Sequence, residues 1–82
     1  MGLMKIFSGS EILAQAKTMR EQEVADYQFQ IDTFIIAIEH SANNSELTEY
    51  RQQLQNLLES NRKEQSKAQL MLDVVNIQIS RL

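Results

Sequence analysis

The sequence predicts an all-α fold in which two long helices form an antiparallel, coiled-coil-like hairpin that oligomerisation or a partner completes. Apolar residues recur in steps of three and four between residues 47 and 82, which is typical of one buried helical stripe. The chain has no proline and only two glycines, Gly2 and Gly9, so neither helix is interrupted. One short polar segment, HSANNS at residues 40–45, separates the two periodic stretches. A connection this short places the helices side by side and antiparallel.

The 82 residues are expected to form a single domain. It would consist of a lead-in (1–7), a first helix (8–40), a turn (41–45) and a second helix (46–82). The apolar lead-in is expected to run extended and pack on the hairpin. Docking on another copy or a partner is the alternative.

The first helix has a clear start signal. Ser8 and Glu11 have the spacing of a capping box, and Phe7 and Ile12 have that of a hydrophobic staple. Further along, Phe29 and Ile36 fall on the flank opposite the main stripe, so a single partner helix cannot cover this end. The expected stripe of this helix is Ile12, Ala16, Met19, Tyr27, Ile31, Phe34 and Ile38, widened by Leu13, Val24 and Ile35.

The turn and second helix follow similar rules. Asn43 with Glu46, or Ser45 with Thr48, supplies the expected N-cap. The expected stripe of the second helix is Leu47, Tyr50, Leu54, Leu57, Leu58, Ala68, Met71, Val75, Ile79 and Leu82.

Each helix also has a polar interval, at residues 20–23 and at residues 60–67. Folding the chain about Asn43 sets the two intervals opposite each other, with Ile36 near Tyr50. We expect salt bridges between them, and we hypothesise that this polar waist fixes the register while weakening the hairpin locally.

The segment 70–82 carries apolar residues on every side of the predicted helix. A helix that is apolar all round must be buried all round, and the first helix supplies only one side. The excess predicts self-association or a dedicated helical partner. The predicted partner interface is Leu70, Met71, Val74, Val75, Ile77, Ile79, Leu82, Phe29 and Ile36.

The sequence contains few residues that would indicate catalysis, metal binding, nucleic-acid binding or a membrane span. The one histidine, His40, is expected to be a helix-end or turn residue, and the carboxylates at 21, 23 and 26 lack the Glu-x-x-His pairs of a di-metal bundle. We therefore expect no enzyme activity, metal or cofactor. A net charge of −3 with interspersed signs argues against nucleic-acid binding. The longest apolar run, 34–38, is far shorter than the roughly 20 residues of a membrane span. The compartment stays open, with the cytoplasm as the default.

Several short stretches together resemble a known family. They are Phe7-Ser8-Gly9, Glu46 to Tyr50 followed by Gln53-Leu54, Arg62 to Ser66, and Asp73-Val74 with Ile77-Gln78. This pattern resembles the small needle subunits of bacterial type III secretion systems, with gaps of a residue. The resemblance implies a helical hairpin that polymerises through its C-terminal helix into an extracellular appendage. Residues 70–82 would then line the contacts between subunits, and the turn would face outwards.

The chain departs from that family at three places. Its turn lacks proline, a leucine replaces the aromatic residue expected after Tyr50, and Leu72 replaces the basic residue before Asp73. Two functions therefore remain open. The first is a self-assembling structural subunit, needle-like or from a related secretion system or virion. The second is a small chaperone, adaptor or phage-encoded inhibitor that binds one target protein.

Overall fold

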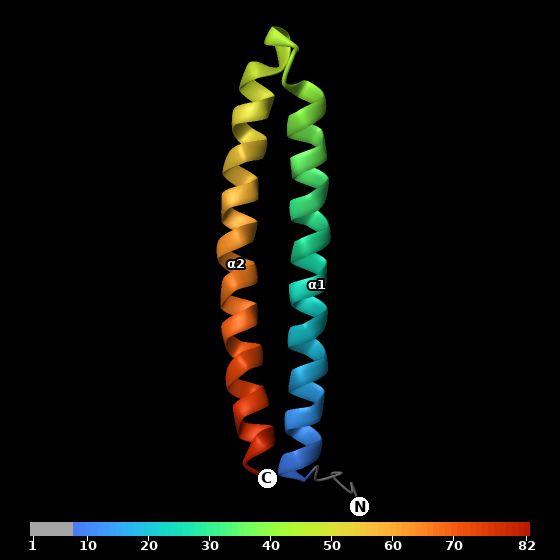
Figure 1. Cartoon of the computed structure of the whole chain (residues 1–82), viewed down its shortest axis with the longest axis vertical. Coiled ribbons are helices and arrows are strands. Elements are labelled where there is room, and N and C mark those ends of the chain that lie inside the picture. Colours follow the sequence, from blue (N-terminus) through green and yellow to red (C-terminus); the bar gives the residue numbers. More distant parts are fainter. Residues whose placement is uncertain (1–7) are drawn as a thin grey trace, which may run out of the picture.

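A computed structural model describes residues 8–82 and shows a two-helix antiparallel hairpin (Figure 1). Helix α1 spans Gly9–Ser41, a short 3₁₀ helix η1 spans Ser45–Leu47, and helix α2 spans Thr48–Ser80. The two long helices have 33 residues each, which corresponds to about 50 Å at 1.5 Å per residue. The predicted all-α fold class is confirmed.

The start of α1 follows from its capping residue. The Ser8 hydroxyl oxygen accepts a hydrogen bond from the Glu11 amide at 3.2 Å, so one of the free amides of the first turn has a partner. The predicted lead-in and the Phe7 part of the staple lie outside the described residues.

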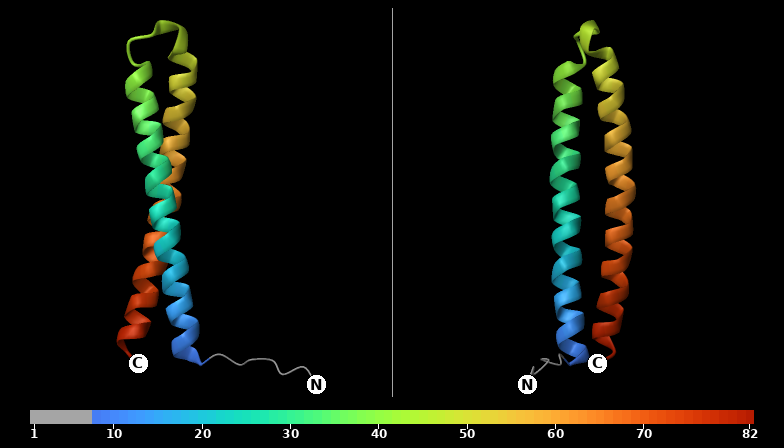
Figure 2. Two further views of the ribbon diagram at one scale, coloured as in Figure 1. Left: turned by 90° about the vertical axis from the view of Figure 1, so that its right-hand side faces the viewer. Right: turned by 180° about the vertical axis from the view of Figure 1, so that it is seen from behind.

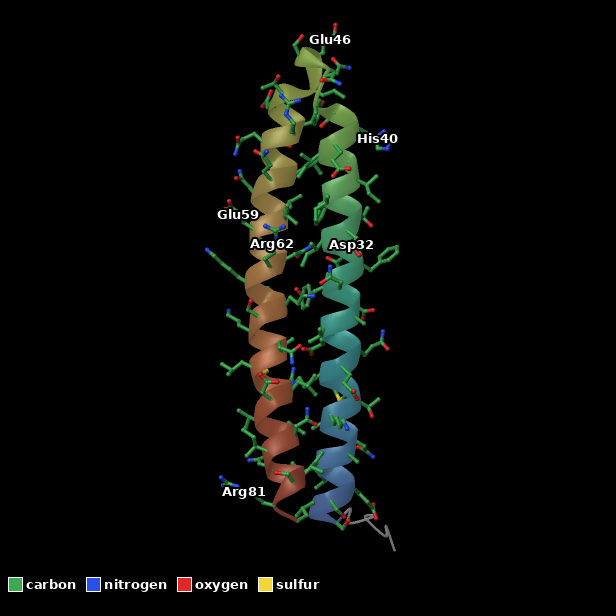
Figure 3. The ribbon with its side chains drawn as sticks, in the orientation of Figure 1. Asp32, His40, Glu46, Glu59, Arg62 and Arg81 are labelled. Carbon is green, nitrogen blue, oxygen red and sulfur yellow. The ribbon has the colours of Figure 1, made fainter. Side chains whose placement is uncertain are left out.

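The connection between the helices is longer than expected, because η1 extends it. The Asn44 side chain accepts from the Glu46 amide at 3.0 Å and caps η1, whereas Leu47 precedes α2 without a side-chain cap. The expected caps, Asn43 with Glu46 or Ser45 with Thr48, were therefore wrong. Glu46 lies at the tip of the hairpin (Figure 3).

The interface between α1 and α2 repeats every seven residues. We call it the seam, and every residue in it is buried or half-buried. Along each helix the steps alternate between four and three, an average of 3.5 residues per turn that keeps one stripe against a partner helix when the two wind together. In Figure 2 (left), α1 lies in front and crosses α2 from lower right to upper left, a left-handed winding. The seam consists of Leu13, Lys17, Arg20, Val24, Tyr27, Ile31, Phe34, Ile38 and Ser41 on α1, and Arg51, Leu54, Leu58, Asn61, Gln65, Ala68, Leu72, Val75 and Ile79 on α2.

The predicted stripes were therefore partly wrong. Ile12 and Met19 on α1, Tyr50, Leu57 and Met71 on α2, and Leu82 after its end are exposed instead of lying in the seam. The expectation followed apolar residues alone, but position on the helix decides which side chain faces its partner. The seam consequently takes in some polar and charged residues and leaves some large apolar ones exposed.

The fully buried core is small. Among the described residues its apolar members are Ile31, Leu58, Ala68 and Leu72, and the Ser41 side chain is also buried. Two helices expose at least half of each cylinder, so no larger core can form without a further layer.

Side-chain hydrogen bonds between the helices establish their register. The Arg51 guanidinium donates to the Ser41 carbonyl at 2.6 Å. Asn61 donates to the Gln30 side chain at 3.0 Å, and Gln65 donates to the Gln28 side chain at 2.8 Å. The hairpin therefore folds about Glu46 rather than Asn43, because η1 belongs to the connection.

This register overturns the predicted facing of the two polar intervals. Residues 61–65 lie beside residues 24–30, not beside residues 20–23. The ion pairs of residues 8–82 form within helices: Arg20 with Glu23 at 2.9 Å, and Lys67 with Glu64 at 3.3 Å. Exposed pairs of this kind contribute only about 0–1 kcal/mol. The expected salt bridges between the helices are absent from the described residues, and amide side chains bond there instead.

Candidate partner-binding surface

The hairpin has two broad faces, one on each side of the seam, and each contains a shallow groove. The first groove is lined by Arg20, Glu23, Asp26, Tyr27, Gln30, Glu64, Lys67, Ala68 and Met71. The second is lined by Val24, Gln28, Gln65, Ser66, Gln69, Leu70 and Asp73. Because the helices repeat every seven residues, each groove residue shares its face with the residues seven positions away.

The face of the first groove is the apolar face. Steps of seven from Asp26 reach Met19 and Ile12, and steps of seven from Glu64 reach Leu57, Tyr50 and Met71. A step of seven from Lys67 reaches Val74. All six of these large apolar side chains are 47–63% exposed: Ile12, Met19, Tyr50, Leu57, Met71 and Val74.

The face of the second groove is the polar face. It presents glutamine, serine and charged side chains from both helices. Of the large apolar side chains on this face, Val24 and Ile35 are half-buried, and Leu70, at its margin, is exposed. The sticks in Figure 3 show polar ends along both helices, including the labelled Asp32, Glu59 and Arg62. Within residues 8–82 the exposed apolar side chains are therefore segregated and not scattered evenly around the hairpin.

Between the two faces, each helix has an outer edge that points away from the seam. Phe29 and Ile36 lie seven residues apart on the edge of α1, and Leu70 and Ile77 lie seven apart on the edge of α2. Phe29 is 74% exposed, which is unusual for a phenylalanine in a stable monomer.

The predicted interface residues divide into two groups. Phe29, Ile36, Leu70, Met71, Val74, Ile77 and Leu82 are exposed and available to a partner. Val75 and Ile79 are half-buried in the seam, where they pack against α1, so their assignment to a partner interface is corrected. The sequence reasoning missed four exposed apolar residues because it placed them in the stripes: Ile12, Met19, Tyr50 and Leu57.

The C-terminal part of α2 is also less evenly surrounded by apolar residues than expected. Gln69, Asp73, Asn76 and Ser80 are all exposed and form a polar strip along the polar face. Leu72 is buried in the seam. The segment is therefore apolar on three sides, not on all of them, which leaves its outer edge and the apolar face to be covered.

His40 is exposed in the last turn of α1 (Figure 3). In the described part of the chain, no group of three or more histidine, cysteine, aspartate or glutamate residues is placed to hold a metal ion. Neither long helix there is sufficiently apolar over its length to cross a membrane. No protein-family model, curated protein or solved structure matches this chain.

Proposed function

We propose that this protein is non-enzymatic and acts through protein–protein assembly, as an antiparallel coiled-coil hairpin whose exposed apolar surface binds further helices. The observation that carries the proposal is the segregation of its exposed apolar side chains. Of the eleven large ones, ten lie on the apolar face or the outer edges, and the eleventh, Leu82, follows the end of α2. Exposed apolar side chains gathered on one face, beside a polar face, are typical of an interaction site.

An energy estimate supports association of moderate strength. Fully burying a large apolar side chain contributes about 1.5–3 kcal/mol, so burying the remaining half of the six on the apolar face of each of two copies contributes on the order of 9–18 kcal/mol. Association costs about 4–15 kcal/mol in lost freedom of motion. The two are comparable, so assembly through the apolar face alone should depend on protein concentration.

A self-assembling structural subunit is the form of this function that we favour. It agrees with the resemblance to needle subunits. It also uses both the apolar face and the apolar side chains on the outer edges. Once the apolar face is covered, Phe29, Ile36, Leu70 and Ile77 remain on the outer edges for further contacts. Those contacts would allow a structure to grow beyond the first pair of copies.

Sedimentation velocity with light scattering on the full chain tests the proposal. We expect a mass above the 9.5 kDa monomer that increases with concentration. A 9.5 kDa monomer at every concentration up to the millimolar range would refute self-assembly. If such a monomer formed a stable complex with one target protein, we would instead propose the chaperone, adaptor or inhibitor function.

A further inference from the structure

We infer that the apolar face binds the same face of a second copy, forming a symmetric four-helix dimer. This inference rests on the proposed function and names the first partner. The two-fold axis would run parallel to the long axis of the hairpin, between the two apolar faces. Each α1 would then lie against α2 of the other copy, and every neighbouring pair of helices in the bundle would be antiparallel, a common bundle topology.

The apolar side chains match in this arrangement. A two-fold axis parallel to the hairpin keeps each residue at its own height, so the register within one hairpin also applies between copies. That register, set by the Asn61–Gln30 and Gln65–Gln28 bonds, places Met19 at the height of Val74. Across the dimer Met19 would therefore meet Val74 of the second copy.

Near the turn the same register pairs a small residue with a large one. Ala37 is half-buried on the apolar-face side of α1, and Leu57, which is 51% exposed, lies within one helical turn of its height on α2. Leu57 of one copy would fill the space above Ala37 of the other. Such alternation of small and large residues lets facing helices interdigitate.

Two of the charges in the middle of the apolar face are complementary as well. Asp26 and Lys67 line the same groove, one on each helix, together with Arg20, Glu23 and Glu64. The two-fold axis would place Asp26 of each copy opposite Lys67 of the other, and symmetry would form this contact twice. Lys67 is 69% exposed at its side chain, so its pairing with Glu64 leaves it free to reach across.

The other two-fold arrangement of these faces fits poorly. An axis perpendicular to the hairpin would put α1 on α1 and α2 on α2. At full overlap Asp26 would then approach its own symmetry copy, and so would Lys67. Like charges in an interface disfavour it, so the charge pattern selects the axis parallel to the hairpin.

The test uses sedimentation velocity on full-length variants that keep the seam intact. Leu57→Asp and Met71→Asp each place a charge on the apolar face, and each should raise the dimer Kd by about a hundredfold or more, from the loss of burial and the cost of a desolvated carboxylate. Phe29→Asp is the matched control, because Phe29 is more exposed but lies on the outer edge. Its dimer Kd should stay within about threefold of the wild-type value. Far-UV circular dichroism should report the same helix content in all three.

A charge exchange tests the orientation. Asp26→Lys and Lys67→Asp should each weaken the dimer by about tenfold, because each places two like-charge contacts in the interface. The double variant should recover most of the affinity. If the double variant is as weak as the single variants, the parallel two-fold axis is wrong.

Two further outcomes separate this inference from the proposed function. If Phe29→Asp dissociates the assembly while Leu57→Asp and Met71→Asp do not, assembly runs through the outer edges, and only the face assignment fails. If the wild-type chain is a monomer at every concentration, self-assembly and the dimer fail together.

Discussion

The two amide side chains in the middle of the seam provide the sharpest test of the fold. Asn61 donates to the Gln30 side chain at 3.0 Å, and Gln65 donates to the Val24 carbonyl at 3.2 Å and the Gln28 side chain at 2.8 Å. Both residues are half-buried and occupy positions where the repeat would accept leucine. We predict that replacing both with leucine makes the hairpin more stable.

The magnitude follows from two opposing terms. Burying half of each leucine contributes about 0.75–1.5 kcal/mol, half of its full transfer free energy. The three lost hydrogen bonds are solvent-accessible, so each costs near the lower limit of about 0.5 kcal/mol. Leucine also has a higher helix propensity than asparagine, by a few tenths of a kcal/mol. The expected net gain is about 0.3–1.8 kcal/mol, which raises Tm by roughly 1–14 °C in a domain of this size.

Thermal unfolding followed by circular dichroism, at one fixed protein concentration, measures the gain. Concentration must be constant because assembly itself shifts Tm. The matched control is Gln52→Leu with Asn56→Leu, the same chemical change on an exposed pair of α2 whose side chains bond each other at 3.3 Å. The control should change stability by no more than about 0.5 kcal/mol. An unchanged or lower Tm for the seam variant would refute the position of Asn61 and Gln65 between the helices.

The remaining predictions concern the core, the turn and the outer edges. Ile31→Ala removes most of a side chain that is 4% exposed, so it should cost about 2–5 kcal/mol and leave the hairpin largely unfolded in urea titrations; retention of most of the stability would contradict its place in the core. Arg51→Gln loses the charge-assisted bond to the end of α1 and should cost about 1.5–3 kcal/mol, whereas the exposed Arg62→Gln should be nearly neutral; equal losses in chemical denaturation would show that the Arg51 bond does not hold the turn. Leu70→Asp combined with Ile77→Asp should leave the dimer intact but remove larger particles from light scattering, and their persistence would place polymer growth elsewhere.

The helical secondary structure of the chain could be predicted from local sequence features. The absence of proline, the Ser8 cap and the single polar turn each act within a few residues, so local chemistry is sufficient to predict two long helices and their antiparallel arrangement. The excess of apolar surface was also predictable, since it depends on composition and on the geometry of one helix. Phe29, Ile36 and Leu70 were recognised in this way, and all three are exposed.

The register and the seam were decided only in the tertiary structure. The addition of η1 to the connection moved the centre of the turn to Glu46, and that shift placed Gln65 beside Gln28 instead of near residues 20–23. Apolar character did not reveal which residues face the partner helix, because two helices that wind around each other bring the same two positions of every seven into contact regardless of chemistry. Tyr50 and Leu57 are therefore exposed while Arg51 and Asn61 lie in the seam. Composition specified how much apolar surface the chain carries, and the relative position of its two helices specified where that surface remains open.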